Sequence, residues 1–485
     1  MSNMLSPGVY PREIDRSFGT PAIADSVGAI VIDSNKGPTE ITEISSRSRF
    51  IELYGEPTSD TPSKHAALRF LRDSNRLNVL RVINDAETAS VDVIDSNLGD
   101  PVFTVNAANP GSWGNNVSVE LRDRSDDDVF QIVVSYHGEV VESFDVSQNP
   151  DKKNGFGRAM YIEDVINNGS DYIRVEDDVS NDDEPVFGES YDLVGGSNDT
   201  SAVTDADIAT GWDSFESTEQ VSANILINAG WASTNVQNKM IEIAEYRKDC
   251  VAVLDIPQED ANDVDSMIEY ANNELNANTS WAALYGPWIR VYDQYNDREV
   301  YLPPSGDAAG VYARTSNEAE AWDAPAGMRR GVLNVLGTQT SLDQGQRDAL
   351  YEANINPVVN FTGEGVVIWG QKTLQAQASS LDRVNVRRLL IHIQNTLEPA
   401  LKPFVFEGNT AFTRDNVASL VENFLEDIQA RRGVTGFSVV VDESNNTSQV
   451  IDSNQLVVDL FIQPARSAEF IRLNTVLTPT GVSFN

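Results

Sequence analysis

Apolar positions in the first hundred residues change between strand spacing and helix spacing. The run at 27–33 predicts a buried strand, 63–74 has the spacing of a short amphipathic helix, and 77–83 predicts a second strand. Ahead of them, prolines and glycines forbid a regular helix and favour an extended arm; they are Pro7, Gly8, Pro11, Gly19 and Pro21.

The strand and helix alternation returns between residues 200 and 373. Residues 223–230 and 250–257 have the composition of buried strands. Between them, apolar residues recur at helical spacing, namely Val236, Met240, Ile243 and Ala244. Two strands joined by one helix favour parallel pairing with a right-handed crossover.

A different pattern fills the chain from Pro101 to about Val194. Short segments with period-two alternation follow one another, separated by turn residues such as Asn109-Pro110-Gly111. The segment therefore predicts a small antiparallel β domain, with a turn-rich linker at 195–199.

Two amphipathic helices dominate the last hundred residues. Val386, Leu389, Leu390, Ile393 and Leu397 form one stripe. In the second helix Thr413 is the predicted N-cap, Gly433 the predicted end, and the apolar face holds Val417, Leu420, Val421, Phe424, Leu425 and Ile428. Two strands at 436–444 and 455–464 follow, and the tail 469–485 has strand composition without a local partner.

Length and charge narrow the class of protein. A chain of 485 residues is long enough for roughly two to four domains. A net charge of −39 argues against nucleic-acid binding through phosphate neutralisation. Residues 96–373 hold 16 basic and 48 acidic side chains, whereas 1–95 and 374–485 are nearly neutral. We therefore expect the two ends to make contacts and the acidic middle to face water.

Neither end nor middle shows a membrane or redox signal. The N-terminus lacks a basic region followed by an apolar core, and no apolar run reaches the roughly 20 residues that span a bilayer. These features favour synthesis and use in a cytoplasm. A single cysteine, Cys250, excludes an internal disulfide and a cysteine-rich metal site.

The usual catalytic motifs are missing from the sequence. His65, His137 and His392 stand alone, and neither HExxH nor GxSxG occurs. The stretch GEGVVIWGQKTL at 363–374 approaches a P-loop, but Gln371 separates the second glycine from Lys372, and the apolar residues between the glycines predict a buried strand. The acidic runs at 126–128 and 176–184 lack EF-hand spacing and predict solvated surface. We expect no catalytic, cofactor-binding or metal-binding residues.

Several segments together resemble the tail sheath proteins of contractile-tailed bacteriophages and related contractile injection systems. They are SPGVYPREID near the N-terminus, NPGSWGNNVSVELRD at 109–123, LYGPWIRVYD at 284–293, the long match at 302–327, INPVVNFTGEGVVIWGQKTL at 355–374, RRLLIHIQNTLEPALKPFVFEGN at 387–409 and PARSAEFI at 464–471. The order matches over most of the chain. Asp307 departs from the pattern, since the family often has histidine there.

The resemblance implies a multidomain protein of α+β and α/β class. It would have an inner α/β core built from both chain ends, an inserted small antiparallel β domain and an inserted α/β domain. The expected divisions are an N-terminal extended arm (1–21), the first part of the core (22–95), the β-rich insertion (96–195), the α/β sheath domain (196–373), the tube-facing second part of the core (374–470) and a C-terminal extended arm (471–485).

The same resemblance implies function and partners. The chain would be a structural subunit, not an enzyme, that polymerises as stacked hexameric rings around a tail tube and contracts to drive the tube through the host envelope. Its partners would be copies of itself, the tube protein, and the baseplate and tail terminator proteins, without cofactor, nucleic acid or membrane insertion. It would be assembled in the host cytoplasm and reside in the virion tail.

Two alternatives remain open from the sequence. One is the sheath of a bacteriocin-like or secretion-type injector, and the other, of a different class, is an uncharacterised α/β hydrolase or sugar-binding protein.

Two groups of residues are candidates for the contacts of such a subunit. Candidate tube contacts are Arg383, Arg387, Arg388, Arg414, Arg431 and Arg432, because guanidinium groups make strong charge-assisted bonds to carboxylates. Candidate arm residues that add strands to neighbouring subunits are Val9, Tyr10, Phe470, Ile471, Leu473, Val476, Val482 and Phe484.

Overall fold

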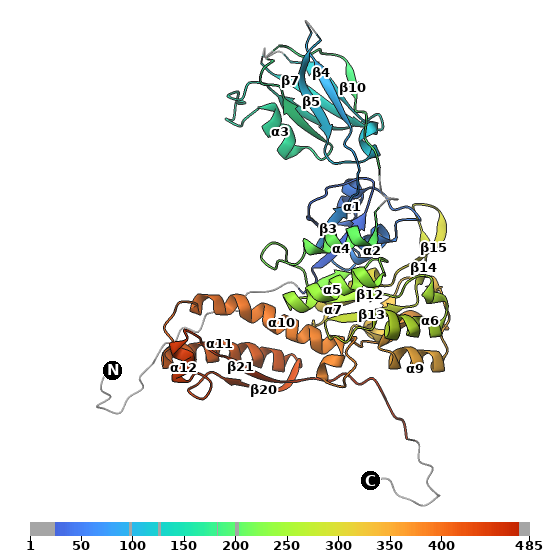
Figure 1. Ribbon diagram of the computed structural model, residues 1–485, viewed down its shortest axis with the longest axis vertical. Coiled ribbons are helices and arrows are strands. Elements are labelled where there is room, and N and C mark those ends of the chain that lie inside the picture. The colour runs from blue at the N-terminus through green and yellow to red at the C-terminus, as the bar shows by residue number, and fades with distance from the viewer. Residues whose placement is uncertain (1–24, 97–98, 125–127, 182, 199–202, 475–485) are drawn as a thin grey trace, which may run out of the picture. The chain divides into compact units, whose positions relative to one another are not determined.

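The computed structural model describes residues 25–96, 99–124, 128–181, 183–198 and 203–474 (Figure 1). The described part of the chain divides into two compact units, one within residues 25–391 and the other within 392–474. Each unit is described on its own below.

A nine-stranded sheet organises residues 25–391. Its order is β16-β19-β18-β13-β12-β11-β1-β3-β2, and all pairs from β18 across to β3 are parallel. The strands are β1 (Gly28–Asp33), β2 (Thr42–Ile44), β3 (Leu77–Val82), β11 (Ile225–Ile227), β12 (Val251–Asp255), β13 (Ala282–Gly286), β16 (Val332–Leu333), β18 (Ile355–Phe361) and β19 (Gly365–Ile368). The strands predicted at 27–33, 77–83, 223–230 and 250–257, and the parallel pairing of the last two, are confirmed.

Helices cover both faces of this sheet. Strand side chains alternate between the faces, so apolar strands present apolar side chains to both, and each face is covered. Ile30 and Ile32 of β1 belong to one apolar cluster, and Ala29 and Val31 belong to the other. The first cluster includes residues of α1 (Arg47–Tyr54), α2 (Pro62–Phe70) and α7 (Ser305–Glu318). The second includes residues of α4 (Asp205–Asp213), α5 (Thr234–Arg247), α6 (Val264–Glu269), the π-helix η4 (Tyr270–Leu275) and α9 (Gln344–Glu352).

The position of the first strands corrects the predicted division of the core. We expected residues 22–95 to form one core with 374–470. Instead, β1 pairs with β11 and β3, so the described residues of 22–95 complete the sheet of 196–373. The physical reason is that a parallel strand buried on both faces needs hydrogen-bonded neighbours on both sides, and β11 supplies the missing one.

Residues 86–198, called the β domain below, interrupt the sheet in the sequence. One sheet has the order β4-β5-β9 and the other β10-β6-β7-β8, and every pair is antiparallel, as predicted. The elements are β4 (Ser90–Ile94), β5 (Pro101–Ala107), η1 (Ser112–Asn116), β6 (Val117–Asp123), β7 (Phe130–Tyr136), β8 (Glu139–Val146), α3 (Ile162–Gly169), β9 (Ile173–Asp177) and β10 (Ser190–Asp192). The two sheets share one apolar cluster.

One histidine of the β domain lies in a turn. His137 connects β7 and β8 and has φ of 52°. The preceding strand ends at Tyr136, and Gly138, also at positive φ, completes the reversal.

A smaller sheet and connecting elements complete residues 25–391. The three-stranded sheet has the order β15-β14-β17, formed by β14 (Ile289–Asp293), β15 (Arg298–Leu302) and β17 (Gly337–Thr338). Short helices are α8 (Gly327–Arg330), η3 (Asp260–Asn262) and η5 (Ser380–Asp382).

The C-terminal unit contains a long helix over a hairpin-like pair of strands. Helix α10 (Val384–Leu401) enters it, followed by η6 (Lys402–Phe404), α11 (Ala411–Ala430), β20 (Val434–Val440), α12 (Ser448–Asp452) and β21 (Asp459–Pro464). The cap of α11 is corrected: the Oγ1 of Thr410, not Thr413, accepts the N–H of the residue three positions on. Arg432, at φ of 65°, makes the left-handed exit that we assigned to Gly433.

Candidate assembly surfaces

The sheet of the C-terminal unit has open edges. Strands β20 and β21 pair antiparallel from Val440 opposite Asp459 to Val434 opposite Pro464, and among the described residues no third strand joins them. Helix α11 packs against β20, with Val434 only 2% exposed. A two-stranded sheet is marginal alone, and each open edge presents unpaired N–H and C=O groups. This sheet can accept further strands.

The segment after β21 is apolar and exposed. Residues 465–474 have no helix or strand, and Phe470, Ile471 and Leu473 are each more than 80% exposed. Large apolar side chains at such exposure lie outside any core of the chain. Groups of them are typical of surfaces that contact another molecule. Of the other candidate arm residues, Val9, Tyr10, Val476, Val482 and Phe484 lie outside the described residues.

Two of the candidate tube-contact arginines are buried in residues 25–391. Arg387 donates to the Oγ of Ser280 and its guanidinium lies 3.7 Å from the centre of the Trp281 ring. Burial lowers the pKa of Arg387 to about 10. Arg388 donates to Ser316 Oγ at 2.5 Å and lies over the ring of Tyr312. Both side chains therefore make their contacts within residues 25–391.

The remaining arginines differ in exposure. Arg414 is buried and donates to Asn409 Oδ1 at 2.9 Å, beside the start of α11. Arg383 is partly buried, with an ion pair to Asp382 at 3.1 Å. Arg431 and Arg432 are exposed at the end of α11, where Arg431 pairs with Asp427 of the same helix. The structure thus leaves Arg431 and Arg432 as the most accessible members of the predicted set.

The P-loop-like stretch is accounted for by packing. Val366, Val367 and Ile368 are buried in β19, which confirms the predicted strand. The Nζ of Lys372 donates to the backbone oxygen of Tyr351 at 2.6 Å and lies over the ring of the same residue. Trp369 is 42% exposed and meets Phe361 edge to face, so it packs only in part. The lysine therefore serves a structural contact.

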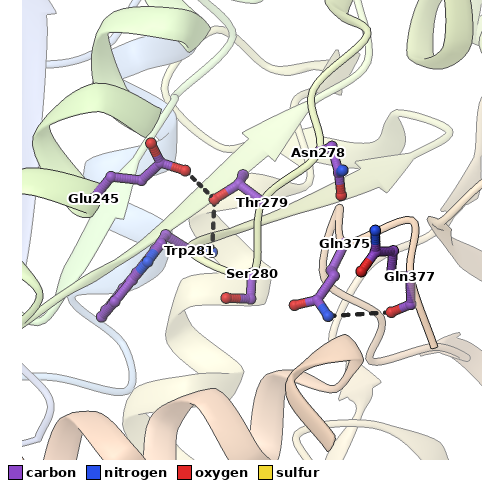
Figure 2. Close-up of a pocket in the computed structure, with 7 residues that line it drawn as sticks. All are labelled: Glu245, Asn278, Thr279, Ser280, Trp281, Gln375 and Gln377. Atoms are coloured by element: carbon purple, nitrogen blue, oxygen red, sulfur yellow. Dashed lines mark hydrogen bonds between the residues drawn. The ribbon is translucent and has the colours of Figure 1, made fainter. Parts of the chain in front are cut away.

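A polar hollow of about 290 Å³ lies among Glu245, Asn278, Thr279, Ser280, Trp281, Gln375 and Gln377 (Figure 2). The Thr279 hydroxyl donates to Glu245 and accepts the N–H of Trp281, and Gln375 donates to the backbone oxygen of Gln377. These bonds connect the segments that line the hollow. Among the described residues, no group of three or more metal-ligating side chains occurs, and no helix is long and apolar enough to cross a bilayer.

Sequence reasoning missed a buried carboxylate at the C-terminal end of β12. Asp255, at the end of β12, is 0% exposed and accepts bonds from the N–H and Oγ of Ser305 and the N–H of Gly230. Burial raises the pKa of Asp255 to about 7. The only sequence signal is a lone acid closing the apolar run VAVLD.

Comparison with known proteins decides the family. Residues 201–374 match the phage tail sheath protein central domain, and residues 376–478 match the phage tail sheath C-terminal domain. The chain belongs to the phage tail sheath family. The family's members are structural proteins, which agrees with the prediction that the chain is not an enzyme.

Two of the relatives are tail sheath proteins of phages. The tail sheath protein of Enterobacteria phage T4 is 33% identical over 380 residues, and that of Vibrio phage KVP40 is 34% identical over 386. Each alignment covers 74% of this chain and 57% of the relative, so the chain spans little more than half the length of these relatives.

Solved sheath structures share the fold. The sheath tail protein from Listeria innocua has a TM-score of 0.64 at 12% identity, over 93% of this chain and 97% of that one. The helical sheath of the anti-feeding prophage in its contracted state has a TM-score of 0.59 at 17% identity, over 97% and 98%. The mixed α/β multidomain class is thereby confirmed for this tail sheath family member.

Proposed function

We propose that the chain is the structural subunit of a contractile tail sheath. Copies polymerise as stacked hexameric rings around a tail tube, and contraction drives the tube through the host cell envelope. Family membership and the likeness to a sheath in the contracted state support the proposal. The subunit resides in the virion tail after assembly in the host cytoplasm.

The open two-stranded sheet is the observation that carries this proposal. Strands β20 and β21 leave two edges, and the exposed tail with Phe470, Ile471 and Leu473 offers an extended apolar segment. Strand addition from one copy to the sheet of the next pairs the edge groups and buries the tail side chains. The N-terminal arm is assigned the same role on a second neighbour.

Contraction is a change between two arrangements of the same subunits. Extended arms keep neighbours joined, while each folded body moves largely as a rigid unit between two sets of interfaces. The free-energy difference per subunit, summed over many copies, does the work without nucleotide hydrolysis. Interfaces of packed side chains suit this role because they are bistable and not continuously deformable.

Tube attachment is assigned to the segment 374–470. Arg431 and Arg432 are exposed there and suit carboxylates of the tube protein. The β domain, with 24 Asp and Glu against 6 Lys and Arg, is assigned to the solvent-facing outside. Further partners are the baseplate and tail terminator proteins, and neither nucleic acid nor membrane is contacted directly.

A second candidate within the same class is the sheath of a headless injector. The likeness to the anti-feeding prophage and to an extracellular contractile injection system favours it. The two candidates differ in the neighbouring genes: capsid genes beside this one indicate a phage, and their absence with toxin cargo genes indicates an injector.

Negative-stain electron microscopy of the concentrated full chain tests the proposal. Hollow striated tubes are the expected result. Where only dispersed particles appear, the cognate tube and baseplate proteins are added, and dispersed particles in their presence as well contradict the proposal. A ligand-binding protein of the hydrolase or sugar-binding class would remain monomeric throughout.

A further inference from the structure

Three aromatic rings of the β domain surround a lysine that does not belong to it. Lys36 follows β1 of the nine-stranded sheet, and its Nζ lies 5.1 Å from the ring centre of Trp113, 4.8 Å from that of Tyr136 and 4.6 Å from that of Tyr172. The rings lie 5.5 to 6.3 Å from one another and are tilted or edge-on, so they form a cage. Ring faces attract an ammonium group, and more strongly where water is excluded.

The caged ammonium is also held on the sheet side. Its Nζ donates to the backbone oxygen of Glu52 at 2.9 Å, near the C-terminal end of α1. Burial lowers the pKa of Lys36, and the carboxylates of Glu52, Asp171 and Glu142 act in the opposite direction. The charge is therefore shared between a helix end of one part and a ring cage of the other.

An ion pair lies next to the cage. Arg49 of α1 makes a bidentate contact to Asp171 of the β domain, at 2.6 and 3.0 Å. The backbone N–H of Asp171 donates to Glu142 at 3.0 Å, which fixes the carboxylate's position within the β domain. Both side chains of the pair are more than a third exposed, so salt screens it more than it screens the cage.

A close backbone approach completes the contact. A Cβ built on Gly111 would lie 2.2 Å from the backbone oxygen of Asn35, and Gly111 has φ of 138°. Only glycine lets the β domain approach the turn that carries Lys36 this closely.

We propose that Lys36, its cage and the Arg49–Asp171 pair form a latch that holds the β domain in one orientation on the nine-stranded sheet. The chain passes between the two parts only twice, and the two passages are bridged at Glu87 with Ser197 and at Ser90 with Val194. Two bridged passages keep the β domain next to the nine-stranded sheet. Its rotation relative to the sheet must be fixed by additional side-chain contacts. The latch makes residues 25–391 one rigid body, and it stands independently of the sheath assignment.

Double electron–electron resonance on the full chain tests the latch. Labels go to Val140→Cys on β8 and Tyr246→Cys on α5, which are 65% and 69% exposed in the native chain, while Cys250 is fully buried and stays unlabelled. Labelled protein is diluted with unlabelled protein, so that pairs between copies do not contribute. We expect one narrow distance distribution in the otherwise native chain and its loss in Lys36→Met/Asp171→Asn.

Matched variants separate the latch from general damage. Lys36→Arg keeps a cation for the cage, and Arg122→Ala removes an exposed pair with Glu120 on the same domain, so both should keep the narrow distribution. Where the double variant fails to fold, Tyr172→Leu removes a ring from the other side of the same contact. A distribution as narrow as the native one, in whichever latch variant folds, overturns the proposal.

Discussion

The nine-stranded sheet and the C-terminal sheet differ in how open their edges are. The nine-stranded sheet ends in β2 and β16, antiparallel strands of three and two residues that leave little edge for another chain. The C-terminal sheet consists of strands of seven and six residues, with both outer edges open among the described residues. The nine-stranded sheet therefore offers little edge for strand addition, whereas the C-terminal sheet, which we assign to assembly, offers two long edges.

Burial follows the same division. Five of the six residues of β1 are buried, and its side chains serve a core on each face. In β20 and β21 a single residue, Val434, is buried, and Phe461 is 61% exposed. Burial on both faces stabilises the nine-stranded sheet within residues 25–391, whereas we expect the two-stranded C-terminal sheet to be stabilised by added strands.

Removing the tail is the strongest way to break this comparison. Deleting 472–485 should abolish sheath assembly, because the open edges of a neighbour lose the strand that pairs them. The monomer should stay folded, since the nine-stranded sheet does not involve these residues. Electron microscopy measures assembly and circular dichroism measures folding. Long normal sheaths from the shortened chain would contradict strand addition by the tail.

Breaking a buried ion pair within residues 25–391 should lower the unfolding free energy more than breaking an exposed pair. Arg69 and Asp307 form a pair with side-chain exposures of 6% and 9%. Arg69→Met leaves the Asp307 carboxylate buried without its partner, which costs about 3–5 kcal/mol of unfolding free energy. Arg76→Met is the matched control, because its pair with Glu43 is exposed and is worth about 0–1 kcal/mol. Urea unfolding of the full chain measures the loss of unfolding free energy for both variants. Equal losses would contradict a larger contribution from the buried pair.

The buried carboxylate of Asp255 predicts a pH effect confined to the same unit. Its pKa of about 7 lies above the unfolded value of about 3.9, so the folded state holds the proton more tightly. The stabilising contribution is complete below about pH 4 and is lost as the pH rises to 7, with an upper bound of about 4 kcal/mol. Asp255→Asn should therefore lose less stability between pH 5 and 8 than the native chain, as urea midpoints will show. An unchanged pH dependence would mean that Asp255 is already ionised at pH 5.

The sequence predicted individual helices and strands better than it predicted which of them belong to the same structural unit. The periodicity of α5, α10 and α11 and the apolar runs of β1, β3 and β12 are local signals, and each appears as an element. The partner of β1 is not local: Ile225 lies almost 200 residues from Gly28, beyond the whole β domain. Hydrophobic pattern marks β1 as buried on both faces but does not say which strand lies beside it.

Site residues show the same limit. Arg387 and Arg388 look like exposed cations in the sequence, yet the stripe of α10 turns them toward Trp281 and Tyr312. An amphipathic pattern predicts which residues are apolar, while long arginine side chains can be buried when a ring face receives the guanidinium. The sequence does not predict the role of Lys36, because the rings around it come from residues 113, 136 and 172, which form no local motif with it.

Charge reversal at the end of α11 should have the smallest effect of the changes considered. Arg431→Glu/Arg432→Glu replaces two exposed cations near the open sheet, and each exposed contact is worth about 0–1 kcal/mol. Co-sedimentation with the cognate tube protein should weaken by roughly 3- to 10-fold, and more so at low salt. Arg298→Glu on β15 is the control, since it makes the same charge change in residues 25–391. Equal weakening by both would assign the effect to net charge alone, and undiminished binding by the double variant would remove these arginines from the tube-contact set.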